Sequence, residues 1–135
     1  MECLLIIGQH LLIECTGKQA HLDQDHLESL LLKAAQAGGA KVLSSHFHSF
    51  GENLGITGVL ILAESHITVH TWPELGYAAF DIFMCGDCRP DLAAKVISDA
   101  DSSAKISIKS YTRKQPTETI NQNTFQPETN QKEIL

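Results

Sequence analysis

Four strand-like runs follow one another between residues 40 and 84, with no helical pattern between them. Helical patterns occur only before and after this series. Helices set apart from a run of strands favour an antiparallel sheet with the helices on one face. We therefore predict an α+β fold, a two-layer sandwich in which a mainly antiparallel sheet carries two helices on one face. The expected strands are residues 3–15, 40–48, 56–64, 66–71 and Tyr77–Met84, with a last strand around Ile106 and Ile108.

The two expected helices each have a recognisable beginning. Asp23 can cap the first helix, and Gly38-Gly39 can end it. The second helix can begin at Asp87 or at Arg89-Pro90-Asp91. The first helix would carry Leu27, Leu30, Leu31 and Ala34 on one face, and the second would run through Leu92, Ala93, Val96 and Ile97.

The length of 135 residues fits a single domain, and a chain of this size can bury about two thirds of its unfolded surface. From Lys114 onward the chain consists mainly of Gln, Thr, Asn, Pro and Glu, with few apolar residues. Such a segment buries too little apolar surface to offset the entropy that folding costs. We expect one folded domain over residues 1–113 and a disordered tail over residues 114–135.

The chain is acidic, with a formal net charge of −6 and a pI near 5.5. These values argue against a nucleic-acid-binding surface and mildly favour a cationic substrate. No apolar run is long enough to span a bilayer, and the apolar start Met1–Ile7 lacks the basic region and cleavage site of a signal peptide. We therefore expect a cytoplasmic protein without a membrane partner, whose cysteines, Cys3, Cys15, Cys85 and Cys88, stay reduced.

The chemistry of the chain is concentrated between Glu64 and Glu74. These eleven residues contain the hydroxyl of Ser65, two imidazoles and two carboxylates. The apolar run Gly58–Ala63 leads into them and is typical of a buried strand. The sequence contains no glycine-rich phosphate loop, no dinucleotide fingerprint and no G-x-S-x-G elbow around the serine. The stretch is therefore the candidate active site.

The Glu64–Glu74 stretch resembles the small prokaryotic form of S-adenosylmethionine decarboxylase. In that family the peptide bond before the serine of a Glu-Ser-His motif cleaves itself, and the serine becomes a covalent pyruvoyl group. The resemblance implies a homodimeric decarboxylase with active sites at the subunit interface, which acts on S-adenosylmethionine and supplies aminopropyl groups for spermidine synthesis. The matching residues are Gly55–Gly58, Glu64-Ser65-His66, His70–Glu74, Gly76–Ala79 and Cys85-Gly86, with a weaker likeness at Gly8-Gln9-His10 and Leu32–Gln36.

Amino-acid decarboxylation explains why such a group is needed. The reaction leaves electrons on the α-carbon, and a carbonyl that forms a Schiff base with the substrate amine can accept them. A pyridoxal phosphate enzyme would need a lysine and a phosphate cradle, and neither is evident in this sequence. A pyruvoyl group made from a serine supplies the carbonyl without them.

The resemblance also implies roles for individual residues in cleavage and turnover. Ser65 would be the pyruvoyl precursor that forms the Schiff base, and Glu64 would be the other residue of the cleaved bond. His70 would be the base in processing. Thr57, where the family usually has serine, would stabilise the tetrahedral intermediate with its hydroxyl. Cys85 would be the proton donor in processing and turnover.

Three further residues would bind the substrate. Glu74 matches the acid that binds the ribose hydroxyls of the substrate. Phe50 matches an aromatic residue that stacks on adenine, although the loop Ser49–Gly55 is one residue longer than usual and lacks the family's proline. Glu14 lies near an acidic position of the family. A ring at residue 50 could also attract the sulfonium of the substrate.

Three alternatives stay open at this point. The same pyruvoyl chemistry could act on a small amino acid such as ornithine or arginine, because Thr57, Met84 and the Ser49–Gly55 loop lie where specificity could change. An unprocessed homologue could serve as a non-catalytic binding subunit. A single C-x-x-C pair is weak support for a zinc site, so no metal is predicted. The residues that could form such a site are His46, His48, His66, His70 and Cys85-Gly86-Asp87-Cys88.

Overall fold

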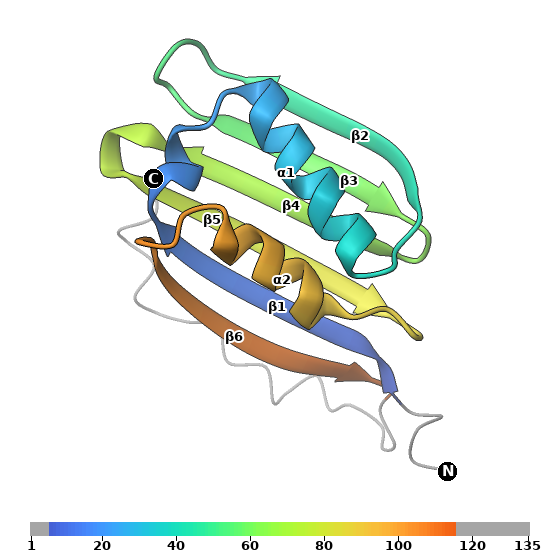
Figure 1. Ribbon diagram of the computed structural model, residues 1–135. Coiled ribbons are helices and arrows are strands. Elements are labelled where there is room, and N and C mark those ends of the chain that lie inside the picture. The colour runs from blue at the N-terminus through green and yellow to red at the C-terminus, as the bar shows by residue number, and fades with distance from the viewer. Residues whose placement is uncertain (1–5, 116–135) are drawn as a thin grey trace, which may run out of the picture.

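The computed structural model describes residues 6–115. Within them the order of strands and α-helices is β-α-β-β-β-β-α-β, as expected from the sequence (Figure 1). The strands are β1 (Ile6–Thr16), β2 (Val42–Ser49), β3 (Ile56–Leu62), β4 (Ser65–Trp72), β5 (Tyr77–Cys85) and β6 (Lys105–Lys114). The helices are α1 (Gln24–Ala37) and α2 (Pro90–Asp99), and two short 3-10 helices are η2 (Lys18–His21) and η3 (Pro73–Leu75).

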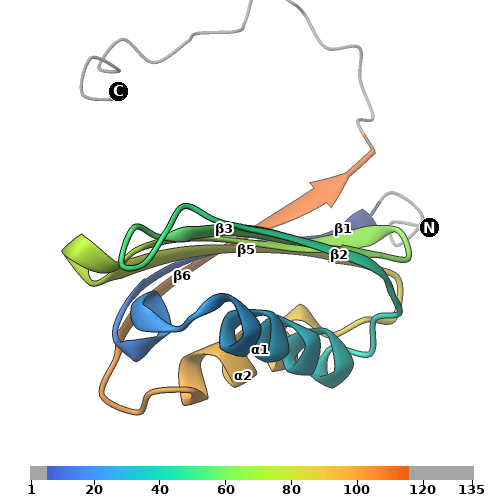
Figure 2. The same ribbon diagram turned by 90° about the horizontal axis from the view of Figure 1, so that it is seen from above.

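All of these strands form one sheet in the order β2-β3-β4-β5-β1-β6, and every neighbouring pair is antiparallel. Both helices pack against the same face of the sheet, as the edge-on view in Figure 2 shows. Within residues 6–115 the other face carries no helix. The predicted two-layer α+β sandwich with two helices on one face is therefore confirmed.

Alternation along the central strands explains where the core lies. In β4 and β5 every second side chain faces the helices and is buried. The intervening side chains form what we call the open face, which includes His10, Thr57, His66, His70 and Phe83. The helix-facing side chains join the apolar faces of α1 and α2 in one core, whose fully buried members include Leu27, Leu31, Leu60, Ile67, Phe80 and Ile82.

The first helix begins and ends as its sequence predicts. The side chain of Asp23 accepts a hydrogen bond from the backbone N–H of His26 at 2.9 Å, which satisfies one of the free donors of the first turn. Gly38 forms the C-cap of α1. The predicted apolar face is confirmed, because Leu27, Leu30, Leu31 and Ala34 are buried.

The second helix begins at Pro90, with Arg89 as its N-cap residue. Proline suits this position because its missing N–H would have no partner in the first turn. The buried residues of α2 are Ala93, Ala94 and Ile97. Leu92 lies on the solvent side of the helix and is 37% exposed.

The turn between β3 and β4 lies earlier in the chain than predicted. We expected one strand over residues 56–64 and the next over 66–71, but β3 ends at Leu62 and β4 begins at Ser65. Ala63 and Glu64 therefore form a two-residue turn. The physical reason is the backbone of Glu64, whose φ of 60° lies in the left-handed region and cannot continue a strand.

Strands β1 and β6 form the two ends of the described segment. Their pairing shifts register between Ile6 and Gly8, which is typical of a β-bulge. Strand β6 ends at Lys114, next to the domain boundary expected at residue 113. The rest of the expected disordered tail, residues 116–135, lies outside the described residues, as does Cys3. No helix within residues 6–115 has the length and apolar character that crossing a membrane requires.

Candidate active site

The bond between Glu64 and Ser65 lies at the turn that joins β3 and β4. Glu64 is exposed and holds the left-handed φ of 60°, a conformation that costs a residue with a side chain about 1–2 kcal/mol. Ser65 is the first residue of β4, pairs with Leu62 of β3, and is 9% exposed. The candidate bond therefore joins a strained turn residue to a residue held by the sheet.

The thiol of Cys85 lies against this bond. Cys85 ends β5, and its Sγ atom lies 3.2 Å from the carbonyl oxygen of Glu64 and 3.8 Å from the Oγ atom of Ser65. A thiol is a weak hydrogen-bond donor, so the contact with the carbonyl can polarise the C=O bond that a nucleophile would attack. The structure thus brings three of the sequence-predicted residues, Glu64, Ser65 and Cys85, into one cluster, which we call the cleavage cluster.

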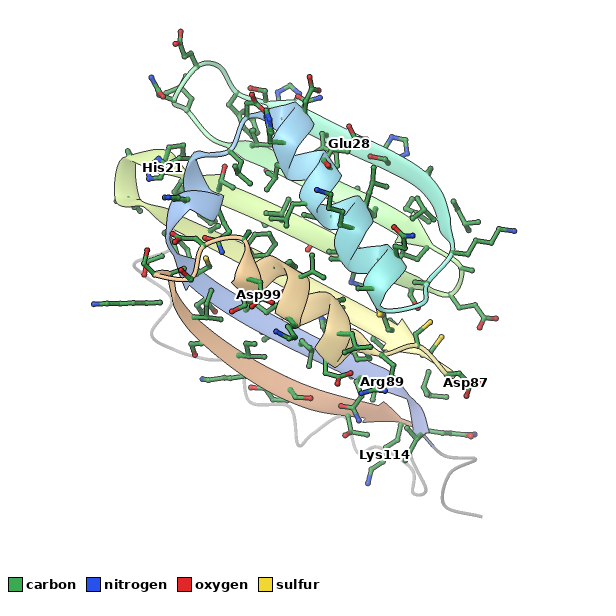
Figure 3. All side chains as sticks on the ribbon, in the orientation of Figure 1. His21, Glu28, Asp87, Arg89, Asp99 and Lys114 are labelled. Atoms are coloured by element: carbon green, nitrogen blue, oxygen red, sulfur yellow. The ribbon has the colours of Figure 1, made fainter. Side chains whose placement is uncertain are left out.

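A pocket of about 470 Å³ opens beside the cleavage cluster. Its size falls in the range of about 300–1,000 Å³ that small-molecule sites occupy. The pocket lies at the end of the sheet where Ile6 of β1 pairs with Lys114 of β6, and Figure 3 labels Lys114 there together with Asp87 in the turn after β5. The residues that line it include His10, Glu64, Ser65, His66, Phe83 and Arg113.

A second cluster forms around His70. The Oγ1 atom of Thr57 on β3 lies 3.1 Å from the Nδ1 atom of His70 on β4, because the two residues are direct cross-strand partners. The ring of His70 lies 6.0 Å from that of Trp72, and Trp72 stacks on Tyr77 at 5.2 Å with an interplanar angle of 18°. We call Thr57, His70, Trp72 and Tyr77 the base cluster.

The residues expected to bind the substrate lie at the same end of the sheet as the base cluster. Glu74 belongs to η3, directly after β4, and its side chain is exposed. Phe50 follows β2, is 56% exposed, and contacts His48 edge to face at 4.6 Å between ring centroids. Glu14 lies on the open face of β1 and accepts a hydrogen bond from the hydroxyl of Tyr77.

The two clusters do not meet within one chain. Ser65 and His70 are five residues apart on β4, which corresponds to roughly 16 Å along an extended strand. Because five is an odd number, Ser65 faces the helices while His70 faces outward on the open face. The cleavage cluster therefore lies at one end of the sheet, and the base cluster with the expected substrate residues lies at the other.

Burial changes the pKa of several groups around these clusters. Desolvation, with the hydrogen bond to Glu14, raises the pKa of Tyr77 to about 12, so the phenol stays protonated and donates. Desolvation, followed by the charge of His10, lowers the pKa of His66, so its imidazole is neutral near pH 7. Burial also raises the pKa of Cys15 to about 11, which marks it as an unreactive core thiol.

Other polar groups take no visible part in the two clusters. Cys15 and Cys88 are free thiols outside the two clusters, and the Sγ atom of Cys88 lies 3.6 Å from the carbonyl oxygen of Gly39. Residues 6–115 contain no group of three or more His, Cys, Asp or Glu side chains arranged to hold a metal ion.

Part of the pocket beside the cleavage cluster is not predicted from the sequence. The patterns indicate His66 only as a possible zinc ligand, and they indicate no role for His10, Phe83 or Arg113. A usable signal existed for His66, because it directly follows Ser65 and must lie on the open face of a strand that begins there. The other residues reach the pocket through pairing of β1 with β5 and β6, which no local pattern reveals.

Comparisons with known proteins agree with this arrangement. The family model for S-adenosylmethionine decarboxylase matches residues 9–114. An S-adenosylmethionine decarboxylase proenzyme from Thermodesulfovibrio yellowstonii is 42% identical over 97 residues, which cover 70% of this chain and 71% of the relative. A proenzyme of the same name from Parasynechococcus marenigrum is 40% identical over 114 residues, covering 82% of this chain and 88% of the relative.

A solved structure also resembles the fold. The crystal structure of the adenosylmethionine decarboxylase from Aquifex aeolicus matches with a TM-score of 0.72 and 31% identity, covering 87% of this chain and 99% of that one. The two-layer domain is thus of the kind found in small decarboxylases. The chain belongs to the S-adenosylmethionine decarboxylase family.

Proposed function

We propose that the protein is a self-processing decarboxylase that removes carbon dioxide from S-adenosylmethionine, with a pyruvoyl group made from Ser65. The observation that carries this proposal is the cleavage cluster. The strained Glu64, the Oγ atom of Ser65 and the Sγ atom of Cys85 converge on one peptide bond in a chain of this family. The word proenzyme in the names of the relatives supports a chain that is made as a precursor.

Self-cleavage follows from the chemistry of this bond. The Oγ atom of Ser65 attacks the carbonyl carbon of Glu64, and an ester replaces the amide. A base then removes the α-proton of residue 65, and elimination releases the carboxylate of Glu64 as the new end of the first fragment. The dehydroalanine left at residue 65 tautomerises and loses ammonia by hydrolysis, which leaves the pyruvoyl group. Release of the strained φ at Glu64 favours the first step.

Two donors assist the attack on the Glu64 carbonyl. The thiol of Cys85 donates toward the carbonyl oxygen, on which negative charge develops as Ser65 attacks. The hydroxyl of Thr57, which lies 3.1 Å from His70 and would reach the bond from a second copy of the chain, is the second donor. In this pair His70 is the base that removes the α-proton of residue 65, and Thr57 stabilises the tetrahedral intermediate.

The separation of the two clusters supports a homodimer in which each site is shared. His70 cannot reach Ser65 of its own chain, because the two lie roughly 16 Å apart on opposite faces of the sheet. A second copy that packs its open face against the first in reverse orientation brings His70 of the partner subunit to the Ser65 end. Exposed apolar side chains on the open face give such a dimer an area to bury, among them Ile61 at 43%, Trp72 at 37% and Tyr111 at 51% exposure.

The end of the sheet that carries the base cluster then supplies the substrate-binding groups of the shared site. The carboxylate of Glu74 can accept hydrogen bonds from the ribose hydroxyls, and the exposed ring of Phe50 can stack on adenine. Glu14 adds negative charge that favours the sulfonium, in line with the net charge of −6.

The pyruvoyl carbonyl would capture the substrate amine and accept the electrons left by carbon dioxide. Cys85 lies close enough to residue 65 to return a proton to the substrate carbon. The product carries the aminopropyl group that spermidine synthesis uses. We place the protein in the cytoplasm, where its free thiols stay reduced.

The function is tested by carbon dioxide release from carboxyl-labelled substrates. We expect release from S-adenosylmethionine and none from ornithine or arginine. The full-length Ser65→Ala variant is the matched control and should release none from any of them. Release from ornithine or arginine alone would contradict the proposed substrate, and equal release by Ser65→Ala would contradict the proposed chemistry.

A further inference from the structure

His66 lies beside the cleavage bond but has no part in the cleavage steps described above. It is the second residue of β4, on the open face, where it pairs with Phe83 of β5. Its ring centroid lies 5.9 Å from that of Phe83 and 5.9 Å from that of His10, which meets it edge on at 88°. Together with Ser65, this imidazole lines the pocket of about 470 Å³.

The nitrogens of His66 are available to whatever enters that pocket. Among residues 6–115 no side chain or backbone group hydrogen-bonds to either ring nitrogen, and neither nitrogen is fully enclosed. His10 differs in this respect. Its Nε2 atom is buried without a partner, and its Nδ1 atom lies 3.5 Å from the guanidinium of Arg113, which can only donate.

The surroundings keep the His66 imidazole unprotonated. Desolvation by Phe83 and the neighbouring strands, followed by the charge of His10, lowers its pKa, while Asp81 on β5 acts in the opposite direction. The other charged groups that line the pocket are Glu64 on one side and Arg113 and Lys114 on the other. Near pH 7 the ring therefore offers a lone pair that can accept a proton.

The proposed reaction needs such an acceptor. The α-amine of the substrate is largely an ammonium group at neutral pH, and an ammonium nitrogen has no lone pair with which to attack a carbonyl. We propose that His66 is a further catalytic residue, whose ring nitrogen accepts one proton from the substrate ammonium in the pocket beside residue 65. This inference rests on the proposed function.

The proton balance of this step is simple. One N–H bond of the ammonium group breaks, its electron pair stays on the amine nitrogen, and an N–H bond forms on the imidazole. The amine can then attack the carbonyl carbon at residue 65. The imidazolium would return its proton to the oxygen that leaves as water when the carbonyl at residue 65 takes up the amine, which restores neutral His66.

Other groups near residue 65 are less suited to this step. The Sγ atom of Cys85 faces the Glu64 carbonyl, and the proposed reaction uses this thiol as a proton donor and not as a base. The nitrogens of His10 are either buried or turned toward Arg113. His66 is therefore the one imidazole with both ring nitrogens free of hydrogen bonds among the described residues that line the pocket.

Amine capture can be measured separately from turnover. Wild type and His66→Gln are first checked by mass spectrometry, and only cleaved chains are compared. Each is mixed with S-adenosylmethionine and cyanoborohydride, and the rate at which the substrate becomes attached to the Ser65-derived terminus is followed by mass. A parallel reaction uses methoxyamine, a carbonyl reagent whose amine is already unprotonated at neutral pH and needs no base.

We expect His66→Gln to slow substrate attachment at least about tenfold while methoxyamine attachment keeps its wild-type rate. In His66→Ala, added imidazole should restore part of the lost rate with the substrate. Equal slowing with both reagents, or no slowing with either, would overturn the inference, as would failure of both variants to cleave. A wild-type chain that neither cleaves nor reacts with methoxyamine would instead overturn the proposed function on which the inference rests.

Discussion

The Sγ atom of Cys85 lies 3.2 Å from the carbonyl oxygen of Glu64, across the turn that joins β3 and β4. The same atom lies 3.8 Å from the Oγ atom of Ser65. In the proposed reaction Cys85 would donate to the bond before cleavage and to a substrate carbon at residue 65 after it. Both proposed roles depend on a thiol at the end of β5.

Replacement of this thiol should damage turnover. In cleaved Cys85→Ser we expect the rate to fall about 10²-fold or more, because a hydroxyl is a poorer proton donor than a thiol. Some protons will then reach the methyl carbon of the cofactor, and transamination will convert the terminus to an inactive alanine-like amine. The measurement is activity per cleaved chain over many turnovers, with mass analysis of the terminus afterwards.

Cys88→Ser is the matched control, because the Sγ atom of Cys88 contacts the carbonyl of Gly39 and not the cleavage cluster. Its turnover and lifetime should stay near wild type. A damaged Cys88→Ser with a normal Cys85→Ser would show that the proton donor is assigned to the wrong cysteine.

Loss of the proposed base should stop processing at an intermediate stage. The acyl shift needs no removal of the α-proton, but elimination does, so His70→Ala should accumulate the ester. Hydroxylamine should cleave this ester, and the products are visible by mass spectrometry. Normal processing of His70→Ala would mean that another base acts.

Mixing two inactive chains tests whether the site is shared. In a dimer of Ser65→Ala with His70→Ala, the intact Ser65 of one chain faces His70 of the partner subunit, so the His70→Ala chain should be cleaved after co-expression. Each variant alone should stay unprocessed. If the mixture gives no fragments although mixed dimers form, the base acts within its own chain and the proposed dimer is wrong.

Self-cleavage should depend on the hydroxyl group of Thr57 more than on the shape of the side chain. Thr57→Val keeps the β-branched outline but removes the donor beside His70, and we expect self-cleavage to slow about 10²–10³-fold. Thr57→Ser keeps the hydroxyl and should process at least as fast as wild type, since its side chain has more rotamers. The rate of fragment formation distinguishes the two. Slow cleavage of both variants would point to packing and not to the hydroxyl.

The low pKa of His66 should make folding stability depend on pH. Unfolded His66 titrates near its ordinary value of 6.5, and the folded group titrates lower. As the pH falls below 6.5, the unfolded chain gains a proton before the folded chain does, so the free energy of unfolding decreases. In an uncleaved Ser65→Ala background, His66→Gln should lose less free energy of unfolding between about pH 7.5 and pH 5. Urea titrations at one protein concentration measure this, and an unchanged loss would contradict the assignment.

Much of the fold could be predicted from local signals. The cap at Asp23, the stop at Gly38 and the alternation of buried residues in β4 and β5 are all set by neighbours in the sequence. The turn at Ala63-Glu64 could not be predicted, because neither residue is of a type that favours a left-handed backbone. Only the pairing of β3 with β4 imposes that conformation.

The motif is enough to predict which residues form the candidate site. It does not predict that they lie at two different ends of the sheet. The odd spacing of Ser65 and His70 implies that the two side chains lie on opposite faces of a strand, and this signal alone could have predicted their separation. The contribution of His10 and Arg113 depends on long-range pairing of β1 and β6 with the rest of the sheet. Such contacts follow from the fold as a whole and leave no trace in a short pattern.

Intact mass spectrometry of the purified wild-type protein tests the central claim most directly. We predict two fragments, Met1–Glu64 and one that begins at the Ser65-derived residue. The second fragment should be lighter by one ammonia than unmodified Ser65–Leu135 and blocked to Edman sequencing, because a pyruvoyl terminus has no amine. Ser65→Ala should give one intact chain. A wild-type protein that remains a single full-length chain after prolonged incubation would contradict self-cleavage at Glu64-Ser65.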